Sequence, residues 1–113
     1  MARVIITKTL YKDILKTFKR ESLTIFNLMK SLEDNPKKGK ILSTVDKIAI
    51  KELKYKKFSS YFITDGHKLK FASNDEISRL IIKFIKMSEK KDQKKVIENL
   101  KDTLSSLGFD KKK

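Results

Sequence analysis

Between Ile50 and Ile63 the chain reads IKELKYKKFSSYFI, in which lysine alternates with apolar or aromatic residues. A period of two sends successive side chains to opposite faces of a β-strand. The pattern therefore predicts neighbouring strands of a small sheet with one apolar face and one basic face. The apolar face of such a sheet has to be covered by amphipathic helices from elsewhere in the chain.

Those helices are predicted in the first third of the chain, after an opening strand. The strand is expected at Ala2–Thr7, where the sequence ARVIIT is apolar and β-branched. Apolar residues then recur at helical spacing over Lys8–Arg20 and again over Ser22–Glu33. Pro36 cannot continue a helix and restrains Asn35 before it, so the second helix should end there. A basic turn, PKKGK, follows.

Four strands are predicted between Lys47 and Met87. Asp-Gly between two alternating runs is a strong hairpin signal, and it occurs at residues 65–66. A second turn is expected at the sequence SNDE. The predicted strands are Lys47–Lys56, Lys57–Thr64, His67–Ala72 and Arg79–Met87, and the last is apolar enough to be central.

Alternation also assigns the faces of the sheet. Leu53 and Tyr55 suit the core side, which puts Lys54 and Lys56 on the opposite, open side. A tyrosine among lysines on an open sheet face fits binding of an RNA backbone together with stacking on a base. The sequence therefore points to the open face as the working surface.

A final helix is expected at Glu89–Leu107, capped by Ser88 and followed by a glycine at the position that favours helix ends. The order of elements predicts an α+β fold, β-α-α-β-β-β-β-α. Its sheet should be rich in antiparallel pairs, with the two N-terminal helices packed on one face. Since 113 residues suffice for one modest core, we expect a single domain over residues 1–109 and a disordered basic tail over residues 110–113.

The charge balance narrows the class of partner. There are 28 Lys and Arg residues against 14 Asp and Glu, giving a net charge of +14. The positive electrostatic field of such a charge favours binding to nucleic acid or to another anionic surface. Nearly all of it is lysine, a point charge suited to phosphates, whereas the arginine fork suits base edges. We therefore expect backbone binding. Genome composition or a hot habitat is the alternative explanation, but it predicts that acidic residues rise together with lysines, and here they have not.

Several classes of site are excluded by what the sequence lacks. There is no cysteine, and His67 is the only histidine. A thiolate site, a multi-histidine metal site and a Ser/His triad with a spare base are therefore not expected, and neither is a cofactor. The chain has no run of 18 apolar residues and no apolar signal-peptide core at its start. A cytoplasmic protein that does not contact membranes is the expectation.

Short motifs add a family resemblance. The sequence has ELK at 52–54, FSSYFITDG at 58–66, and FIK at 84–86 with a serine and a lysine soon after. Asn-Pro at 35–36 is followed by Gly39 and Leu42. These motifs and the order of elements resemble the RelE/ParE toxin superfamily, most of all its RelE/HigB-like mRNA interferase toxins. The resemblance covers most of the chain and implies the RelE-like fold.

The resemblance implies the toxin of a type II toxin–antitoxin system, which cleaves mRNA in the ribosome A site without a metal. In that reaction the ribose 2′-OH attacks the adjacent phosphate, which requires a base, stabilising cations and an acid for the leaving oxygen. An antitoxin with an acidic segment is the implied partner. Catalytic roles are implied for Lys54, Tyr61 and Lys86. Further RNA contacts are expected from neighbouring lysines: Lys51, Lys56, Lys57, Lys68, Lys90 and Lys91.

One position departs from the family pattern. The family commonly has a phosphate-clamping arginine where this chain has Ser59, which carries no charge and cannot form a bidentate fork. Tyr61 or a neighbouring lysine would have to compensate. Two alternatives therefore stand beside the nuclease. One is a RelE-like domain that binds RNA or DNA without cleavage, and the other is a ParE-like toxin that acts on a protein target.

Overall fold

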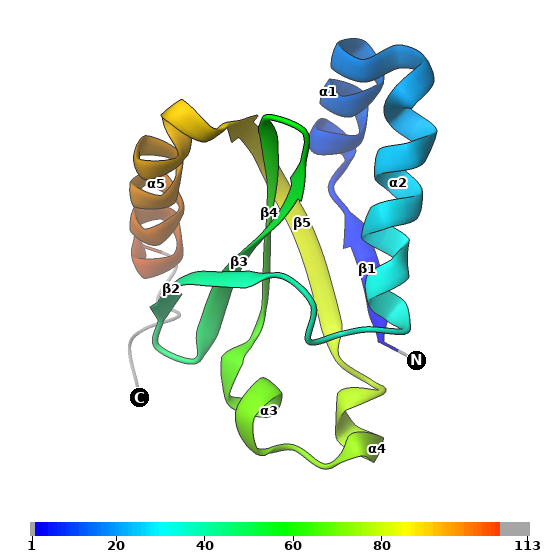
Figure 1. Ribbon diagram of the computed structural model, residues 1–113. Helices are drawn as coiled ribbons and strands as arrows, with labels where there is room; N and C mark the ends of the chain where they lie inside the picture. Colours follow the sequence, from blue (N-terminus) through cyan, green and yellow to red (C-terminus); the bar gives the residue numbers. More distant parts are fainter. Residues whose placement is uncertain (1, 107–113) are drawn as a thin grey trace.

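The computed structural model describes residues 2–106 and shows a five-stranded mixed sheet with helices on both faces (Figure 1). The strand order is β1-β5-β4-β3-β2. Only the pair β1–β5 is parallel, and the other three pairs are antiparallel. The α+β class and the antiparallel-rich sheet are therefore confirmed. The strands are β1 (Arg3–Ile6), β2 (Lys40–Val45), β3 (Ile48–Tyr55), β4 (Phe58–Asp65) and β5 (Ile81–Glu89).

The two N-terminal helices form as predicted but are shorter. Thr7 caps α1 (Lys8–Phe18), because its Oγ1 accepts a hydrogen bond from the backbone N–H of Leu10 at 3.3 Å. A 3₁₀ turn, η1 (Lys19–Glu21), leads directly into α2 (Ser22–Lys30). A second one, η2 (Ser31–Glu33), ends α2. The last residues of both predicted helices thus form tighter 3₁₀ turns, which are frequent at helix ends.

These two helices cover one face of the sheet and make the larger core. Burial of each large apolar side chain there stabilises the fold by roughly 1.5–3 kcal/mol. The core includes Val4, Leu10, Ile14, Ile25, Met29, Leu32, Leu53, Phe62, Leu80, Ile82 and Phe84.

The opposite face, predicted to be open, is partly covered by α5 (Gln93–Ser106). A smaller core lies between this helix and the sheet and contains Val45, Ile50, Tyr61, Leu100 and Leu104. The prediction of an open face was wrong because β3 and β4 carry apolar residues on both faces. A strand buried on both faces reads as a continuous apolar run rather than as a clean alternation.

The segment between β4 and β5 also differs from the prediction. Asp65 does not begin a hairpin turn. Its carboxylate accepts the backbone N–H of Lys68 at 3.0 Å and caps the short helix α3 (Gly66–Phe71), so the predicted strand at His67–Ala72 was wrong. Asp is as favourable at a helix N-cap as in a tight turn. The sheet keeps five strands because β2, which the sequence reading missed, takes the place of that strand.

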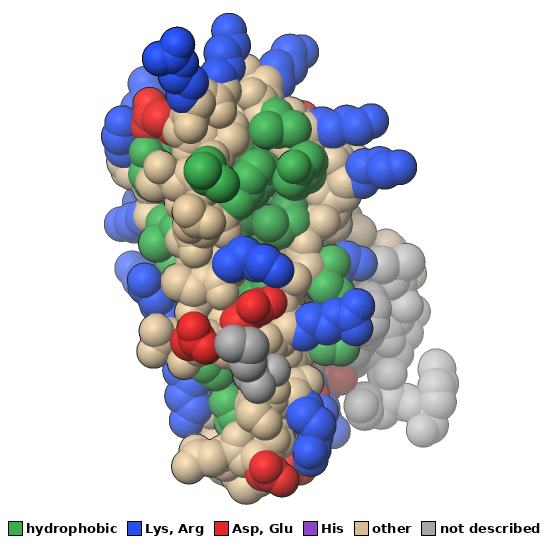
Figure 2. Space-filling view, turned by 90° about the vertical axis from the view of Figure 1, so that its right-hand side faces the viewer, with side chains coloured by type: hydrophobic (Ala, Val, Ile, Leu, Met, Phe, Trp, Pro, Cys, Tyr) green, Lys and Arg blue, Asp and Glu red, His purple; other side chains and the backbone are tan. Residues whose placement is uncertain are grey.

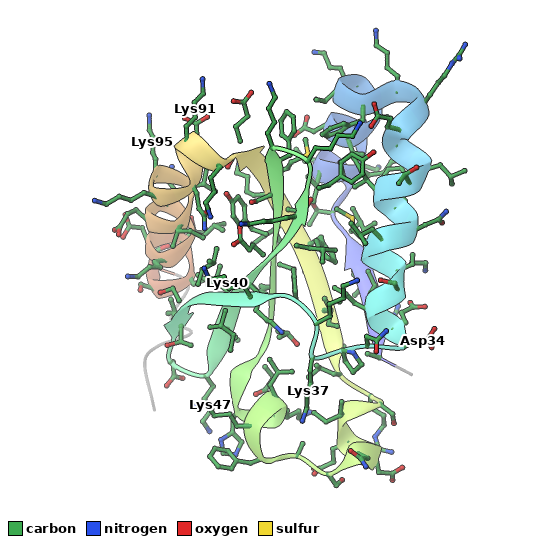
Figure 3. The ribbon with its side chains drawn as sticks, viewed as in Figure 1. Asp34, Lys37, Lys40, Lys47, Lys91 and Lys95 are labelled. Atoms are coloured by element: carbon green, nitrogen blue, oxygen red, sulfur yellow. The ribbon has the colours of Figure 1, made fainter. Side chains whose placement is uncertain are left out.

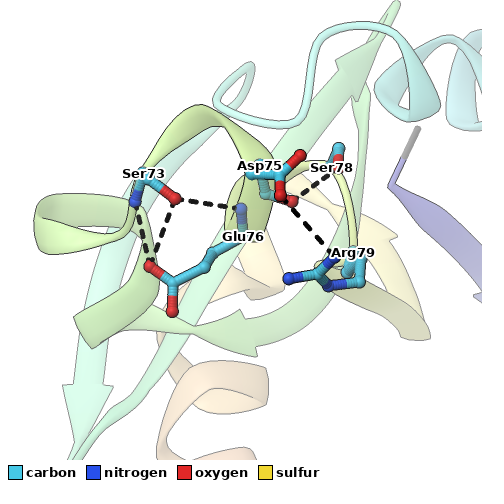
Figure 4. A network of polar contacts seen from close by, with 5 residues as sticks. All are labelled: Ser73, Asp75, Glu76, Ser78 and Arg79. Atoms are coloured by element: carbon cyan, nitrogen blue, oxygen red, sulfur yellow. Dashed lines mark hydrogen bonds and ion pairs between the residues drawn. The ribbon is translucent and has the colours of Figure 1, made fainter.

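The predicted turn at residues 73–76 is instead the start of α4 (Asn74–Ile77) (Figure 4). The backbone N–H of Ser73 donates to the Glu76 carboxylate, and the N–H of Glu76 donates to Ser73 Oγ. This reciprocal capping box satisfies two N–H groups at the helix start. An ion pair between Arg79 and Asp75 at 3.9 Å closes the turn that leads into β5.

The end of β5 also lies later than predicted. Ser88 is still part of the strand, and the 3₁₀ turn η3 (Lys90–Asp92) precedes α5. The expected last helical residue, the glycine after it and the basic tail lie outside the described residues. No helix within residues 2–106 has the length and the apolar content needed to cross a membrane.

The two edges of the sheet differ. At β1, the backbone N–H of Ala2 donates to the Glu33 carbonyl at 3.1 Å, and that of Val4 donates to the Glu33 carboxylate at 3.3 Å. The turn η2 thus occupies this edge. The other edge strand, β2, has no strand beyond it within residues 2–106. Among the described residues, β2 is therefore the edge left without a strand partner or a capping turn.

One lysine of β3 belongs to the core. Lys51, expected to contact RNA, points toward the N-terminal helices and is only 2% exposed. Its ammonium donates to the carbonyls of Lys37 and Lys38 at 3.1 and 3.0 Å and lies 5.7 Å from the centre of the Phe62 ring. Burial lowers the pKa of Lys51. Lys51 therefore anchors the loop between α2 and β2 and is not available to a phosphate at the surface.

Replacing Lys51 should therefore destabilise the fold. Lys51→Ala leaves two carbonyls without their donor and opens a cavity, so the free energy of unfolding should fall by about 2–4 kcal/mol. The exposed Lys54→Ala on the same strand is the matched control and should change it by less than about 0.5 kcal/mol. Urea denaturation followed by circular dichroism measures both. Equal midpoints for the two variants would contradict the structural role of Lys51.

Candidate nucleic-acid interface

Strand pairing brings the three predicted catalytic residues together at one end of the sheet. Tyr61 pairs with Glu52 of β3 on one side and with Lys86 of β5 on the other. Lys54 pairs with Ser59, two residues before Tyr61. Residues that pair across strands share a face. Lys54, Tyr61 and Lys86 therefore lie on the face that carries α5.

Lys86 reaches this face only because β5 contains a bulge. Tyr61 pairs with Lys86, but the next residue, Phe62, pairs with Phe84, so Ile85 is an extra residue. Simple alternation from Phe84 would have put Lys86 on the side of α1 and α2. A bulge shifts the residues beyond it to the other face. Sequence reasoning had no signal for this bulge.

Under the lysines lies a set of buried polar groups. Ser59 Oγ donates to Glu52 Oε1 at 2.8 Å. Ser88 Oγ donates a hydrogen bond to the Glu89 carbonyl at 3.0 Å. Its one proton is therefore in use, and in its 2.8 Å contact with Tyr61 it accepts a hydrogen bond from the phenol hydroxyl. Ser88 was expected to cap a helix, but it orients Tyr61 instead.

The same burial decides what Tyr61 can do. Its side chain has no exposed surface and packs under α5, so it cannot stack on a base at the surface. Burial raises the pKa of Tyr61, the hydroxyls of Ser88 and Ser59 offset part of this effect, and the charge of Glu52 adds to it. The phenol therefore stays neutral at neutral pH and is held by Ser88 within the smaller core.

Glu52 is a buried carboxylate with an unsatisfied oxygen. Oε1 binds Ser59, whereas Oε2 has no hydrogen-bond donor within residues 2–106. The ammonium of Lys90 stands 3.8 Å from Oε2. A buried charge is costly unless it is paired, and Lys90 supplies that pairing from η3. Nearby in sequence, Gln93 has a buried Oε1 that also lacks a donor in the described part of the chain.

The other predicted RNA-binding lysines divide between two locations. Lys57 and Lys91 flank the interface and each lies near the Glu89 carboxylate, at 3.9 and 3.8 Å. Figure 3 shows Lys91 and Lys95 beside each other at the start of α5. Next to them an open hollow of about 420 Å³ lies between β2 and α5, lined by Leu42, Lys90, Lys91, Gln93, Lys94, Ile97 and Glu98.

Two lysines of the predicted set lie elsewhere. The ammonium of Lys56 forms an ion pair with the carboxylate of Glu21 in η1 at 2.7 Å. The same carboxylate accepts a hydrogen bond from the Tyr55 hydroxyl at 2.6 Å. The Lys56 bond lowers the pKa of Glu21 and the Glu21 bond raises that of Lys56. Lys68 lies in α3, beyond the other end of β4. The candidate interface therefore comprises Lys54 and Lys86 with Lys57, Lys90 and Lys91.

This set of groups can bind phosphates and move protons through amines. The exposed ammonium groups come from β3, the β3–β4 turn, β5 and η3, and a buried hydrogen-bonded layer supports them. Within residues 2–106 no three histidine, cysteine, aspartate or glutamate side chains gather as metal ligands would. No family model matches the chain, and neither a curated protein nor a solved structure matches it. Function therefore has to be inferred from the site itself.

The buried phenol gives the protein a pH dependence at alkaline pH. An unfolded tyrosine loses its proton near pH 10, whereas native Tyr61 keeps it to higher pH. The unfolded state then binds fewer protons, so the free energy of unfolding should fall as pH rises above about 10. Tyr61→Phe removes this contribution.

Urea denaturation of wild type and Tyr61→Phe at a series of pH values tests this. At neutral pH the variant should be less stable by about 1 kcal/mol, since Ser88 loses a hydrogen-bond partner. The difference should shrink above about pH 10. Lys51, whose pKa is lowered by burial, makes the free energy of unfolding rise with pH, but it is present in both proteins and cancels in the difference. A difference that stays constant with pH would show that the phenol titrates alike in both states.

Proposed function

We propose that the protein is the toxin of a type II toxin–antitoxin pair and cleaves mRNA on the ribosome with lysine amines instead of a metal. The observation that carries this proposal is the gathering of Lys54, Lys86 and Lys90 at one end of the α5 face. They come from three different elements. The motif resemblance and the succession of a strand, two helices, an antiparallel meander and a C-terminal helix support a RelE-like fold and the same function.

The chemistry follows from what the site offers. Lys90, Lys57 and Lys91 hold the RNA backbone, while Lys54 and Lys86 stand over the scissile phosphate. One of these two side chains takes the proton of the ribose 2′-OH as its oxygen attacks phosphorus. The other, as an ammonium, donates a proton to the 5′-oxygen as the P–O5′ bond breaks. The products are a 2′,3′-cyclic phosphate and a 5′-OH.

The departure at Ser59 has a structural counterpart. Ser59 is buried and its hydroxyl donates a hydrogen bond to Glu52, so it does not face the solvent as a phosphate-binding side chain would. The same carboxylate holds Lys90 at 3.8 Å. A cation from η3 therefore lies close to Ser59, which stands where the RelE/HigB-like toxins that this chain resembles commonly have arginine. We infer that Lys90 supplies the positive charge that Ser59 lacks.

A second candidate is a domain that binds RNA without cutting it. The burial of Tyr61 and Ser59 favours it, because it takes away two hydroxyl groups that could otherwise have contacted a phosphate at the surface. No particular observation favours a ParE-like toxin directed at a protein. For that class, replacing Lys54 or Lys86 should leave toxicity unchanged.

Cleavage is tested by mRNA integrity in a translating extract, with cut sites mapped by primer extension. Wild type should produce cuts that require ribosomes. Lys54→Ala and Lys86→Ala should each reduce cutting by about 100-fold or more, as expected for loss of a proton-transfer group. The matched control is Lys47→Ala, an exposed lysine at the other end of the sheet (Figure 3), which should cut like wild type. Intact mRNA with folded wild-type protein would reject the nuclease.

RNA affinity has its own test, independent of cleavage. Binding to a synthetic RNA whose 2′-hydroxyls are methylated, so that it cannot be cut, should weaken with salt because lysine–phosphate contacts release counterions. Each of Lys54→Ala and Lys86→Ala should reduce the slope of log affinity against log salt by about 0.7, and Lys47→Ala should not. Filter binding at several salt concentrations gives the slopes. Equal slopes for all four proteins would place the RNA elsewhere.

A further inference from the structure

The outer surface of the N-terminal helices carries a patch of apolar side chains. Tyr11 and Leu15 of α1 are 45% and 43% exposed, and Leu23 of α2 is 67% exposed. The half-buried Phe26 ring stacks on Tyr11, with ring centres 4.6 Å apart and planes 9° from parallel. We call Tyr11, Leu15, Leu23 and Phe26 the outer helical patch. Figure 2 shows hydrophobic side chains gathered in the upper part of this side, with lysines and arginines around them.

Three of the four patch residues, Tyr11, Leu15 and Leu23, are additional to the larger core, whereas Phe26 also packs against it. In α1 the core uses Leu10 and Ile14, and Tyr11 and Leu15 repeat the same spacing one residue later, on the outside of the helix. In α2 the core uses Ile25 and Met29 in the same way. Each helix therefore has exposed apolar side chains outside its core stripe, namely Tyr11 and Leu15 in α1 and Leu23 in α2. Neighbouring exposed apolar residues rimmed by charged ones mark interaction surfaces.

The charges around the patch indicate the partner. Residues 8–30 contain six basic side chains and only two acidic ones, Asp13 and Glu21. Glu21 is already bound to Lys56 and to the Tyr55 hydroxyl. A second copy of this chain would bring the same positive charges against them, which opposes self-association. The complementary occupant has acidic residues beside apolar ones.

We propose that the outer helical patch binds an acidic amphipathic helix of a partner protein. Two adjacent antiparallel helices with apolar residues at i and i+4 or i+3 present the surface on which such a helix lays its own apolar face. The patch lies on the side of α1 and α2, whereas Lys54 and Lys86 lie on the side of α5. A partner here leaves the lysines accessible. This proposal does not rest on RNA cleavage.

The probe is a fluorescent synthetic helical peptide with leucine at i, i+3, i+4 and i+7 and glutamate at the other positions. Its binding is followed by fluorescence anisotropy without RNA. Wild type should bind it saturably, and the double variant Leu15→Ser/Leu23→Ser should bind about tenfold more weakly or worse. The matched control is Ile41→Ser/Phe71→Ser, which removes two exposed apolar side chains, 51% and 71% exposed, elsewhere on the surface. It should bind like wild type.

Several outcomes would overturn the proposal: no saturable binding by wild type, equal binding by both double variants, or equal binding of a peptide with lysine in place of glutamate. Sedimentation of wild type as a dimer that Leu15→Ser/Leu23→Ser dissociates would assign the patch to a second copy instead. Lys54→Ala and Lys86→Ala should bind the peptide like wild type. Peptide binding and mRNA cleavage can therefore fail independently.

Discussion

The strand β4 is buried on both faces, and the rest of the structure depends on this constraint. Phe62 points into the core under α1 and α2, while its neighbour Tyr61 points into the core under α5. Helices must therefore cover both sides of the sheet, because one uncovered side would leave a large ring in water. The same constraint fixes the place of the lysines. They occupy the end of the sheet where β4 begins and where α5 starts.

The buried layer ties one cation of the basic site to the sheet. Lysines on a strand surface are usually mobile, because long side chains keep their rotamer freedom in water. In this protein, two hydrogen-bonded pairs, Ser59–Glu52 and Tyr61–Ser88, lie on the same face beneath them. Glu52 in turn holds Lys90 from a different element. Backbone pairing and one buried carboxylate thus position cations that are far apart in sequence.

Much of the fold could be predicted from local patterns, but contacts between distant segments could not. The opening strand, both N-terminal helices and the strands β3 and β4 follow from periodicity, which needs only neighbouring residues. The pair Asp65-Gly66 is compatible with both a hairpin turn and a helix cap, and in the folded protein Asp65 caps α3. The strand β2 is short and follows a basic turn, so its pattern was weak. Neither the bulge at Ile85 nor the anchoring of Lys51 by two loop carbonyls has a signature in the sequence.

The unequal edges of the sheet have a consequence for how molecules could stack. An exposed strand edge is a template for another strand, and fibres grow when each molecule offers two such edges. Here Glu33 occupies the β1 edge through two N–H groups, and β2 remains the edge without a strand partner among the described residues. Two molecules that paired through β2 would leave no second free edge of this kind. Edge pairing would therefore stop at a dimer instead of continuing into a filament.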